Sequence, residues 1–465
     1  MDICFHELKF SYFRYASSSE PHGRWFLDMT ATISAVPVLQ SERIYTLDML
    51  RGLAVLGILL MNITIFSHPS VVGDDPSTLN ETGINYYIWY ATTWIFNGTQ
   101  RALFSMLFGA GIILFVTRQE RKLNGLAPAD YFFRRQLWLI LFSLFDVYIL
   151  LWNGDILFDY ACLGMLMFVF RNWSPKALII GAGVCVVLMT VRENRFLYER
   201  KDLIAEGEAI AAIDTTRTKL TTLQTEAVEE MTASKARNEP KAKLKRMEKD
   251  IEKVTSSYAS VYDFRTDDYV NSLVRYLYFS AWDVLIFMLF GMAFFKLGIL
   301  TGSISTKVYA WMCIGGLTIG LVLSWLFVRY RIDNNFSWFS FSKNVPFSFY
   351  ELGRTPRAIG ILGLIMLLYK SNFFKILFLW MRPVGQMAFT NYLMQSLICG
   401  ILFNAYGFKL YGQLQRYEVY LIVLAIWIVQ IIYSNVWMHY FLFGPFEWAW
   451  RSLTYWRRQP FVRAA

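Results

Sequence analysis

The sequence predicts an all-α protein, a polytopic bundle of transmembrane helices. Three observations predict it: 55% of the 465 residues are apolar, only 17% are charged, and the mean hydropathy is +0.36. Soluble domains carry about 25% charged residues and 45–50% apolar ones. The composition therefore excludes a water-soluble enzyme, a disordered chain and a collagen-like chain. Aromatic residues make up 18% of the chain, as expected for aromatic belts at the membrane surfaces.

Long apolar runs separated by short polar loops predict about ten membrane spans. A bilayer core about 30 Å thick requires about 20 apolar residues in a helix. The predicted spans are 47–66, 103–118, 136–152, 155–171, 177–191, 275–298, 308–329, 357–370, 384–406 and 417–436.

The segment 84–118 needs separate treatment, because as one straight helix it would extend for about 50 Å. The loop 118–135 is rich in Lys and Arg, whereas the loop 67–83 contains acidic residues and no Lys or Arg. These loops should lie on opposite sides of the membrane, which requires one net crossing. We therefore expect 84–98 to form an interfacial or re-entrant helix, with a break at Asn97-Gly98.

The charge pattern also predicts orientation and partners. Basic loops alternate with acidic or neutral ones, and this alternation places both termini on the cytoplasmic side of the membrane. The net charge of +10 comes from these short loops rather than from one basic soluble segment. We therefore expect the lipid bilayer as a partner and no nucleic acid.

The chain divides into five predicted parts. Residues 1–40 are expected to be an unstructured leader, and residues 1–28 to reflect a start codon assigned upstream of Met29. An N-terminal transmembrane half follows at 41–191 and a C-terminal half at 271–456, with a basic cytoplasmic tail at 457–465.

The insert at 192–270 separates the two halves and has a different composition. It is rich in Ala, Glu, Lys and Thr, with Pro240 as its breaker. Leu244, Met247, Ile251 and Val254 recur at the 3-4-3 spacing of a helical packing seam. This pattern predicts an extramembrane helical hairpin.

Ionisable side chains inside the first span are candidates for ligand binding, because burying them in lipid is costly. Asp48 and Arg51 are three residues apart and can form an ion pair. Asn62 lies eleven residues after Arg51, on the same face and about 16 Å away. A purely structural interpretation is also open: Arg51 can reach the headgroups and Asn62 can bond a neighbouring helix.

Four more polar residues in or beside predicted spans are candidates for substrate or donor binding. Asp155 opens the fourth span, where it can also act as an N-cap. Asp283 lies in the sixth span without an obvious local partner. Asn391 and Gln395 share one face of the ninth span, where hydrogen bonding between helices is the alternative explanation.

His68 is the candidate general base, because it follows the first span at its outer mouth. It can equally be an ordinary loop histidine. The sequence contains no HExxH, P-loop or GxSxG motif and no cysteines at metal-ligand spacing. We therefore expect no bound metal or cofactor.

Several runs of residues together resemble the YeiB-type family of bacterial inner-membrane proteins, whose domain has no known function. The resemblance covers residues 41–460. The matching runs are LDxxRGxA at 47–54, LFSMLFGAG at 103–111, WxGDIL at 152–157, GMA at 291–293, GQMAFTNYLMQS at 385–396 and FGPFEWAWRSLTY at 443–455.

The first span is also distantly similar to the transmembrane acyltransferases. That resemblance implies acyl transfer from cytoplasmic acyl-CoA, as co-substrate, to an acceptor at the outer face. Arg51 would hold a polar part of the donor, Asn62 would orient groups, and His68 would be the base. Asn62 stands where one acyltransferase branch has an essential histidine, whereas the branch that acetylates heparan sugars has Asn there and His just beyond.

Transport is the alternative function. A polar pathway through Arg51, Asp283, Asn391 and Gln395 would carry a small anionic or amphiphilic solute. The substrate is expected to be a small molecule or a glycan in either case, and the sequence predicts no oligomeric state.

Overall fold

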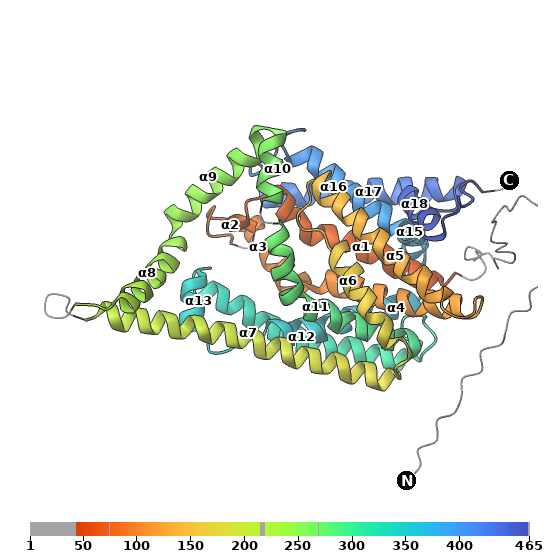
Figure 1. Cartoon of the computed structure of the whole chain (residues 1–465), viewed down its shortest axis with the longest axis horizontal. Helices are drawn as coiled ribbons and strands as arrows, with labels where there is room; N and C mark the ends of the chain where they lie inside the picture. The colour runs from red at the N-terminus through yellow and green to blue at the C-terminus, as the bar shows by residue number, and fades with distance from the viewer. Residues whose placement is uncertain (1–42, 74, 214–218, 268, 464–465) are drawn as a thin grey trace, which may run out of the picture. The chain divides into compact units, whose positions relative to one another are not determined.

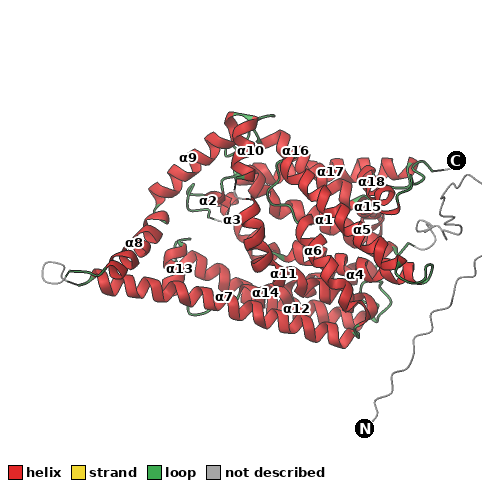
Figure 2. Ribbon diagram, in the orientation of Figure 1, coloured by secondary structure: helices red, strands yellow, loops and turns green. Residues whose placement is uncertain are grey.

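The computed structural model describes residues 43–73, 75–213, 219–267 and 269–463, with only the backbone described for 270–280. The leader predicted at 1–40 lies outside these residues. The described part of the chain is helical throughout (Figure 2), with a single antiparallel bridge between Phe441 and Val462. The prediction of an all-α fold is confirmed.

The helices follow one another along the chain with short connections (Figure 1). They are α1 (Tyr45–Ser67), α2 (Ser70–Gly73), α3 (Gly83–Ala91), the π-helix η2 (Thr92–Phe96), α4 (Thr99–Glu120), α5 (Ala127–Tyr148), α6 (Leu157–Met167), the 3-10 helix η3 (Phe168–Asn172), α7 (Pro175–Ala211), α8 (Thr222–Arg237), α9 (Pro240–Ser256), α10 (Tyr258–Thr266), α11 (Tyr269–Lys296), α12 (Thr306–Asp333), α13 (Trp338–Asn344), α14 (Tyr350–Lys370), α15 (Lys375–Gln386), α16 (Ala388–Phe403), α17 (Arg416–Tyr440) and α18 (Pro445–Tyr455).

Six segments of the described residues are long and apolar enough to cross a membrane. They are α1, the segment Gly83–Glu120, α7, α12, α14 and α17. Only 17% of the apolar window is buried in α7 and in α12, so both present apolar faces of the kind that lipid covers. The finer prediction of about ten spans is not confirmed. Two predicted spans are instead short helices, since α6 ends at Met167 and α16 has 16 residues.

The predicted break at Asn97-Gly98 is present between η2 and α4. Gly98 has a φ of +73°, a left-handed conformation that favours glycine. A Cβ at this position would lie 2.5 Å from Cδ of Arg354 and 2.7 Å from the hydroxyl of Tyr350. The chain therefore turns here because only glycine permits both the backbone conformation and the close packing on α14.

The core is built around α1. It packs against α4, α15, α16 and α17, while α11 lies along α4 and α7, and α12 along α14. Close approach of α1 and α15 depends on Gly385, because a Cβ there would lie 1.7 Å from the carbonyl oxygen of Asp48. Small residues at helix contacts are typical of membrane bundles.

The insert differs from the predicted hairpin in how its helices pair. Helix α7 continues without interruption through residue 192 to Ala211, and α8 packs back against this extension. Helix α9 follows α8 after Pro240 and packs on α2 and α10 instead (Figure 1). The antiparallel partner of α8 is therefore the extension of α7, because no proline interrupts that helix beyond its first turn.

Candidate functional site

A cavity in the bundle is lined by an unusual concentration of arginine, and we call it the basic cavity. Its lining includes five arginines but only two acidic residues, Asp48 and Glu447. The arginines are Arg43, Arg51, Arg118, Arg135 and Arg451. Guanidinium groups in excess over carboxylates favour an anionic ligand.

The basic cavity changes character along its length. On α4 its lining runs from Arg118 and Gln119 at one end to Phe104 at the other. These sixteen residues correspond to about 22 Å along the helix axis. Around Phe104 the wall consists of apolar and aromatic side chains, among them Leu157, Tyr160 and Tyr392. The cavity therefore suits an elongated ligand with an anionic head and a less polar extension.

Arg51 lies in the wall of the basic cavity and is held by Asp48. Its Nη1 donates to Oδ1 of Asp48 at 3.1 Å, and Gln386 Nε2 donates to the other carboxylate oxygen at 3.2 Å. The Arg51 side chain remains 28% exposed, so a ligand can reach it. The ion pair predicted from the i, i+3 spacing is confirmed.

Helix α18 supplies Glu447 and Arg451, which the sequence analysis did not single out. Glu447 accepts from the backbone N–H groups of Phe389 (2.7 Å) and Thr390 (3.0 Å) and thereby caps α16. Burial raises the pKa of Glu447. Burial also lowers the pKa of Arg451, and the positive charge of Arg43 lowers it further. Bound anions would relieve this accumulation of positive charge.

Two amides in the wall of the basic cavity have unused acceptors. The side-chain carbonyl oxygens of Gln119 and Gln136 are buried and have no hydrogen-bond partner in the part of the chain that the structure describes. Leaving such a group unpaired costs about 1–3 kcal/mol. A ligand that carries hydroxyl or N–H donors as well as anionic groups would satisfy them.

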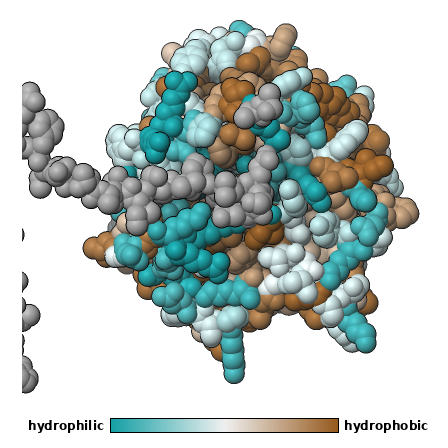
Figure 3. Space-filling view, turned by 90° about the vertical axis from the view of Figure 1, so that its right-hand side faces the viewer, coloured by the Kyte–Doolittle hydropathy of each residue, from teal (hydrophilic) through white to brown (hydrophobic). Residues whose placement is uncertain are grey.

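Hydrophilic side chains gather on the end of the bundle where α18 lies, with hydrophobic side chains beside them (Figure 3). Exposed basic residues at this end include Arg121, Arg457 and Arg458. They lie at the same end of α4 and α18 as the arginines of the basic cavity. An approaching anion would therefore meet positive charge before it enters.

His68 and Asn62 are not among the residues that line the basic cavity. His68 is only 3% exposed. Its Nδ1 lies 2.7 Å from the hydroxyl of Ser67, and its Nε2 lies 3.0 Å from the carbonyl oxygen of Leu414. The Nε2–H must donate to that carbonyl, so Nδ1 accepts from Ser67. Burial and the charge of Arg416 lower the pKa of His68 to about 4, which keeps the ring neutral.

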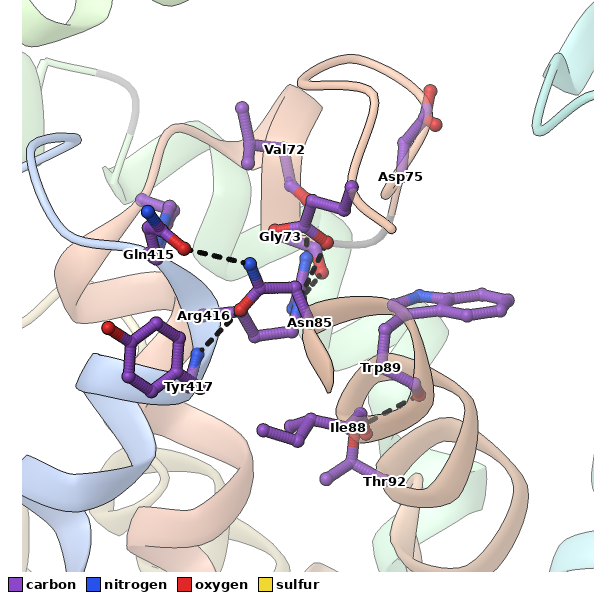
Figure 4. A network of polar contacts seen from close by, with 12 residues as sticks. Val72, Gly73, Asp75, Asn85, Ile88, Trp89, Thr92, Gln415, Arg416 and Tyr417 are labelled. Atoms are coloured by element: carbon purple, nitrogen blue, oxygen red, sulfur yellow. Dashed lines mark hydrogen bonds and ion pairs between the residues drawn. The ribbon is translucent and has the colours of Figure 1, made fainter. Parts of the chain in front are cut away.

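The loop that follows His68 is fixed by a polar network around Arg416 (Figure 4). Arg416 donates to Oε2 of Glu81 at 2.8 Å and to the carbonyl oxygens of Val72 and Gly73 at 3.1 and 3.3 Å. Asn85 bonds the backbone N–H of Tyr417 at 2.9 Å. These contacts tie the segment after α1 to the start of α17. His68 therefore lies in a region that is held together by hydrogen bonds between the two segments.

Asn391 and Gln395 lie in a hydrogen-bond network between helices. Asn391 Nδ2 donates to the carbonyl oxygen of Val384 at 3.0 Å and to Ser434 at 3.1 Å. Gln395 Nε2 donates to the carbonyl oxygen of Val55 at 3.1 Å and to Gln430 at 3.0 Å. Both side chains connect α16 to its neighbours, and neither lines the basic cavity.

Asp155 lies behind the inner end of the basic cavity. It accepts from the hydroxyl of Tyr392, a cavity residue, at 3.0 Å, and from the backbone N–H of Leu157 at 3.0 Å. Asp146 on α5 is fully buried near it and accepts a hydrogen bond from the hydroxyl of Ser396 at 3.2 Å. The sequence analysis missed Asp146, although an acidic residue inside the predicted span 136–152 was a usable signal.

Asp283 has partners that are distant in the sequence, in agreement with the expectation that it has no obvious local one. Arg101 of α4 and Arg354 of α14 both donate to its carboxylate. Arg354 also pairs with Glu351 at 2.6 Å. We call Arg101, Asp283, Glu351 and Arg354 the ion cluster. Its members come from three helices, so their proximity could not be deduced from spacing along the chain.

The chain is similar to several known proteins. Residues 294–457 match the family model described as a protein of unknown function, DUF418. The chain is 29% identical to the uncharacterized protein YxaH of Bacillus subtilis strain 168, over 92% of this chain and 98% of that protein. It is 28% identical to the uncharacterized protein YeiB of Escherichia coli strain K12, over 89% and 96% of the two chains. The chain is therefore similar to these YeiB-like DUF418 proteins over most of its length. No solved structure matches it.

These similarities confirm the resemblance to YeiB-type proteins that the sequence motifs predicted. The matched segment 294–457 contains α12 to α18. It therefore supplies Gln386, Tyr392, Glu447 and Arg451 to the basic cavity. The remaining wall comes from α1, α4, α5 and α6, which lie before that segment.

Proposed function

We propose that this DUF418-like protein binds acyl-CoA in the basic cavity and transfers the acyl group to an acceptor, a small molecule or a glycan. The observation that carries the proposal is the combination of five arginines with a long, less polar inner end. The phosphate groups of CoA would bind the arginines, since guanidinium recognises phosphate through paired hydrogen bonds. The pantetheine arm and acyl chain would extend towards Tyr160 and Tyr392.

The donor would enter from the cytoplasm. Basic loops flank cytoplasmic ends of membrane helices, and the exposed Arg121, Arg457 and Arg458 lie at the same end as the arginines of the basic cavity. The proposal therefore includes a bacterial inner-membrane location with the C-terminus in the cytoplasm.

Tyr392 and Asp155 would together take up the proton that the attacking group of the acyl acceptor loses. An acceptor hydroxyl or amine attacks the thioester carbonyl carbon, so that a C–O or C–N bond forms and the C–S bond breaks. The acceptor's proton passes through the Tyr392 hydroxyl to the Asp155 carboxylate, 3.0 Å away, and then to the CoA thiolate, which leaves as the thiol. We assign this role to Asp155 rather than to His68, because Asp155 bonds the cavity residue Tyr392, whereas His68 does not line the basic cavity.

Binding of acyl-CoA to the purified full-length protein tests the proposal. We expect Arg51→Ala to weaken acetyl-CoA and palmitoyl-CoA binding at least tenfold, because it removes a charge-assisted hydrogen bond to phosphate. Arg329→Ala is the matched control, since Arg329 is exposed and pairs only with Asp333 in its own helix among the described contacts. Calorimetric titration that finds no binding, or equal binding by both variants, would contradict the proposal.

Transport of an anionic amphiphile is a second candidate function, favoured by the position of the ion cluster. The backbone oxygen of Arg101 lies 3.3 Å from the hydroxyl of Tyr160, a residue of the basic cavity. Arg354 lies against Tyr350, which lines a second cavity. A buried cluster between two cavities can act as a gate. Flux of an acylated anion in proteoliposomes that is lost in Asp283→Asn, without acyl transfer, would favour this function.

A further inference from the structure

A second cavity, which we call the aromatic cavity, lies away from the basic one. Its lining comes from α3, η2, α7, α12, α13 and α14. Figure 1 shows α13 beside the extension of α7, far from α18, and α13 packs on α7. Six of its fourteen lining residues are aromatic: Trp89, Phe196, Phe327, Trp338, Phe341 and Tyr350.

One oxygen atom in the aromatic cavity lacks a partner among the described residues. It is Oε2 of Glu193, which is buried. The wall next to it is rigid, because Asn194 bonds both the N–H of Ser348 (2.8 Å) and its carbonyl oxygen (3.2 Å). A carboxylate oxygen can only accept, so a ligand here must present an O–H or N–H group.

The charges around the aromatic cavity disfavour ions of either sign. The guanidinium of Arg331 lies over the ring of Trp338, 4.1 Å from its centroid, and that of Arg200 lies 4.6 Å from the centroid of Phe196. A cationic ligand would meet two guanidinium groups, and an anionic ligand would meet the buried carboxylate of Glu193. A neutral ligand avoids both costs.

We infer that the aromatic cavity binds a neutral carbohydrate ring. The C–H face of a pyranose packs on aromatic rings, while its equatorial hydroxyls donate to a carboxylate and exchange hydrogen bonds with serine hydroxyls. Glu193, Ser342 and the tryptophans Trp89 and Trp338 supply these groups. A charged or purely apolar ligand would leave either Glu193 or the aromatic faces without a suitable partner.

This carbohydrate site does not depend on the proposed acyl transfer. Asn97 in the aromatic cavity lies just before α4, and Phe104 in the basic cavity lies on α4, seven residues further along the chain. Arg101 of the ion cluster lies between these two positions along the chain, with its backbone oxygen 3.3 Å from the hydroxyl of Tyr160. Ligands of the two cavities would therefore bind separately.

Titration of the full-length protein with glucose and with N-acetylglucosamine tests the inference. The protein is purified in a detergent without a sugar headgroup, and binding is followed by calorimetry and tryptophan fluorescence. We expect saturable binding that weakens at least tenfold in Glu193→Gln and in Trp338→Leu. Glu199→Gln is the matched control, because Glu199 is exposed on the same helix and pairs with Arg195.

Three results would overturn the inference: no saturable binding of either sugar, equal binding by Glu193→Gln and Glu199→Gln, or stronger binding of choline or sulfate than of sugars. Gel filtration confirms that each variant is folded, and Trp338→Phe provides a milder change if Trp338→Leu is not. Arg51→Ala should bind sugar normally, so failure of acyl-CoA binding and failure of sugar binding can be distinguished.

Discussion

Arg51 and His68 were expected to act in one site, but their side chains lie in different surroundings. They are seventeen residues apart on or beside α1, which corresponds to about 25 Å. Arg51 faces the basic cavity, whereas His68 is buried against Ser67 and Leu414. Spacing could predict a shared helix face, but not that neighbouring loops would enclose one of the two residues.

The buried, neutral His68 makes stability depend on pH. Its pKa is about 4 in the folded protein, against 6.5 for an unperturbed histidine. The unfolded chain therefore binds more protons between these values, and stability falls as the pH drops from about 6.5 towards 4. The full difference corresponds to about 3 kcal/mol. We expect His68→Gln to lack this part of the pH dependence in thermal unfolding. Parallel curves for the two proteins would contradict the assignment.

Tyr392 links the basic cavity to Asp155, so its hydroxyl can be tested separately from its ring. We expect Tyr392→Phe and Asp155→Asn to slow acyl transfer about 100-fold, the range for loss of a proton acceptor, with acyl-CoA affinity unchanged. The measurement is release of free CoA thiol by membranes that carry the native acceptor.

Tyr433→Phe is the control for this experiment. It also removes one buried hydroxyl, but the partner of that hydroxyl is Asn391 in the network between helices. Equal rates for Tyr392→Phe and Tyr433→Phe would rule out the proposed proton path.

At the scale of helices, the sequence predicted continuous apolar elements well and interrupted ones poorly. The spans 47–66 and 417–436 correspond to α1 and α17, and the break at Asn97-Gly98 was located correctly. Hydropathy does not show where a helix ends inside an apolar run, so the short α6 was predicted as a full span. Composition also changes at residue 192 while α7 continues, because charged residues are good helix formers too.

The contact between α1 and α15 makes a prediction for Gly385. A Cβ there would overlap the backbone of Asp48, which cannot move without shifting α1. We expect Gly385→Ala to destabilise the protein by about 1–3 kcal/mol and to weaken acyl-CoA binding, because Asp48 holds Arg51. Thermal unfolding in detergent measures the first effect.

Gly183→Ala is the matched control, since no atom lies within 4 Å of the added Cβ on that membrane helix. If the two alanine variants unfold at the same temperature, the close packing of α1 on α15 is not as described.

At the scale of the molecule, the basic cavity brings together residues from both ends of the described chain. Arg43 and Arg451 line it together, although about four hundred residues separate them. The sequence identified Asp48 and Arg51 because they lie within one apolar run. Arg135 lies at the edge of a predicted span and Arg451 lies after the last one, and arginine in such positions is ordinarily explained by the membrane surface. Only the tertiary packing shows that these arginines share one cavity.

The proposed donor of the basic cavity predicts how the chain is oriented in the membrane. If the arginines of the basic cavity bind a cytoplasmic donor, the exposed Arg458 must be cytoplasmic and the insert must lie outside. Arg458→Cys and Glu239→Cys, each in a variant whose five cysteines are replaced by serine, test this with a membrane-impermeant maleimide. We expect intact cells, with a permeable outer membrane, to label position 239 at once and position 458 only after the inner membrane is opened. The reverse pattern would place the basic cavity outside the cell, where acyl-CoA is not available, and would exclude the proposed donor.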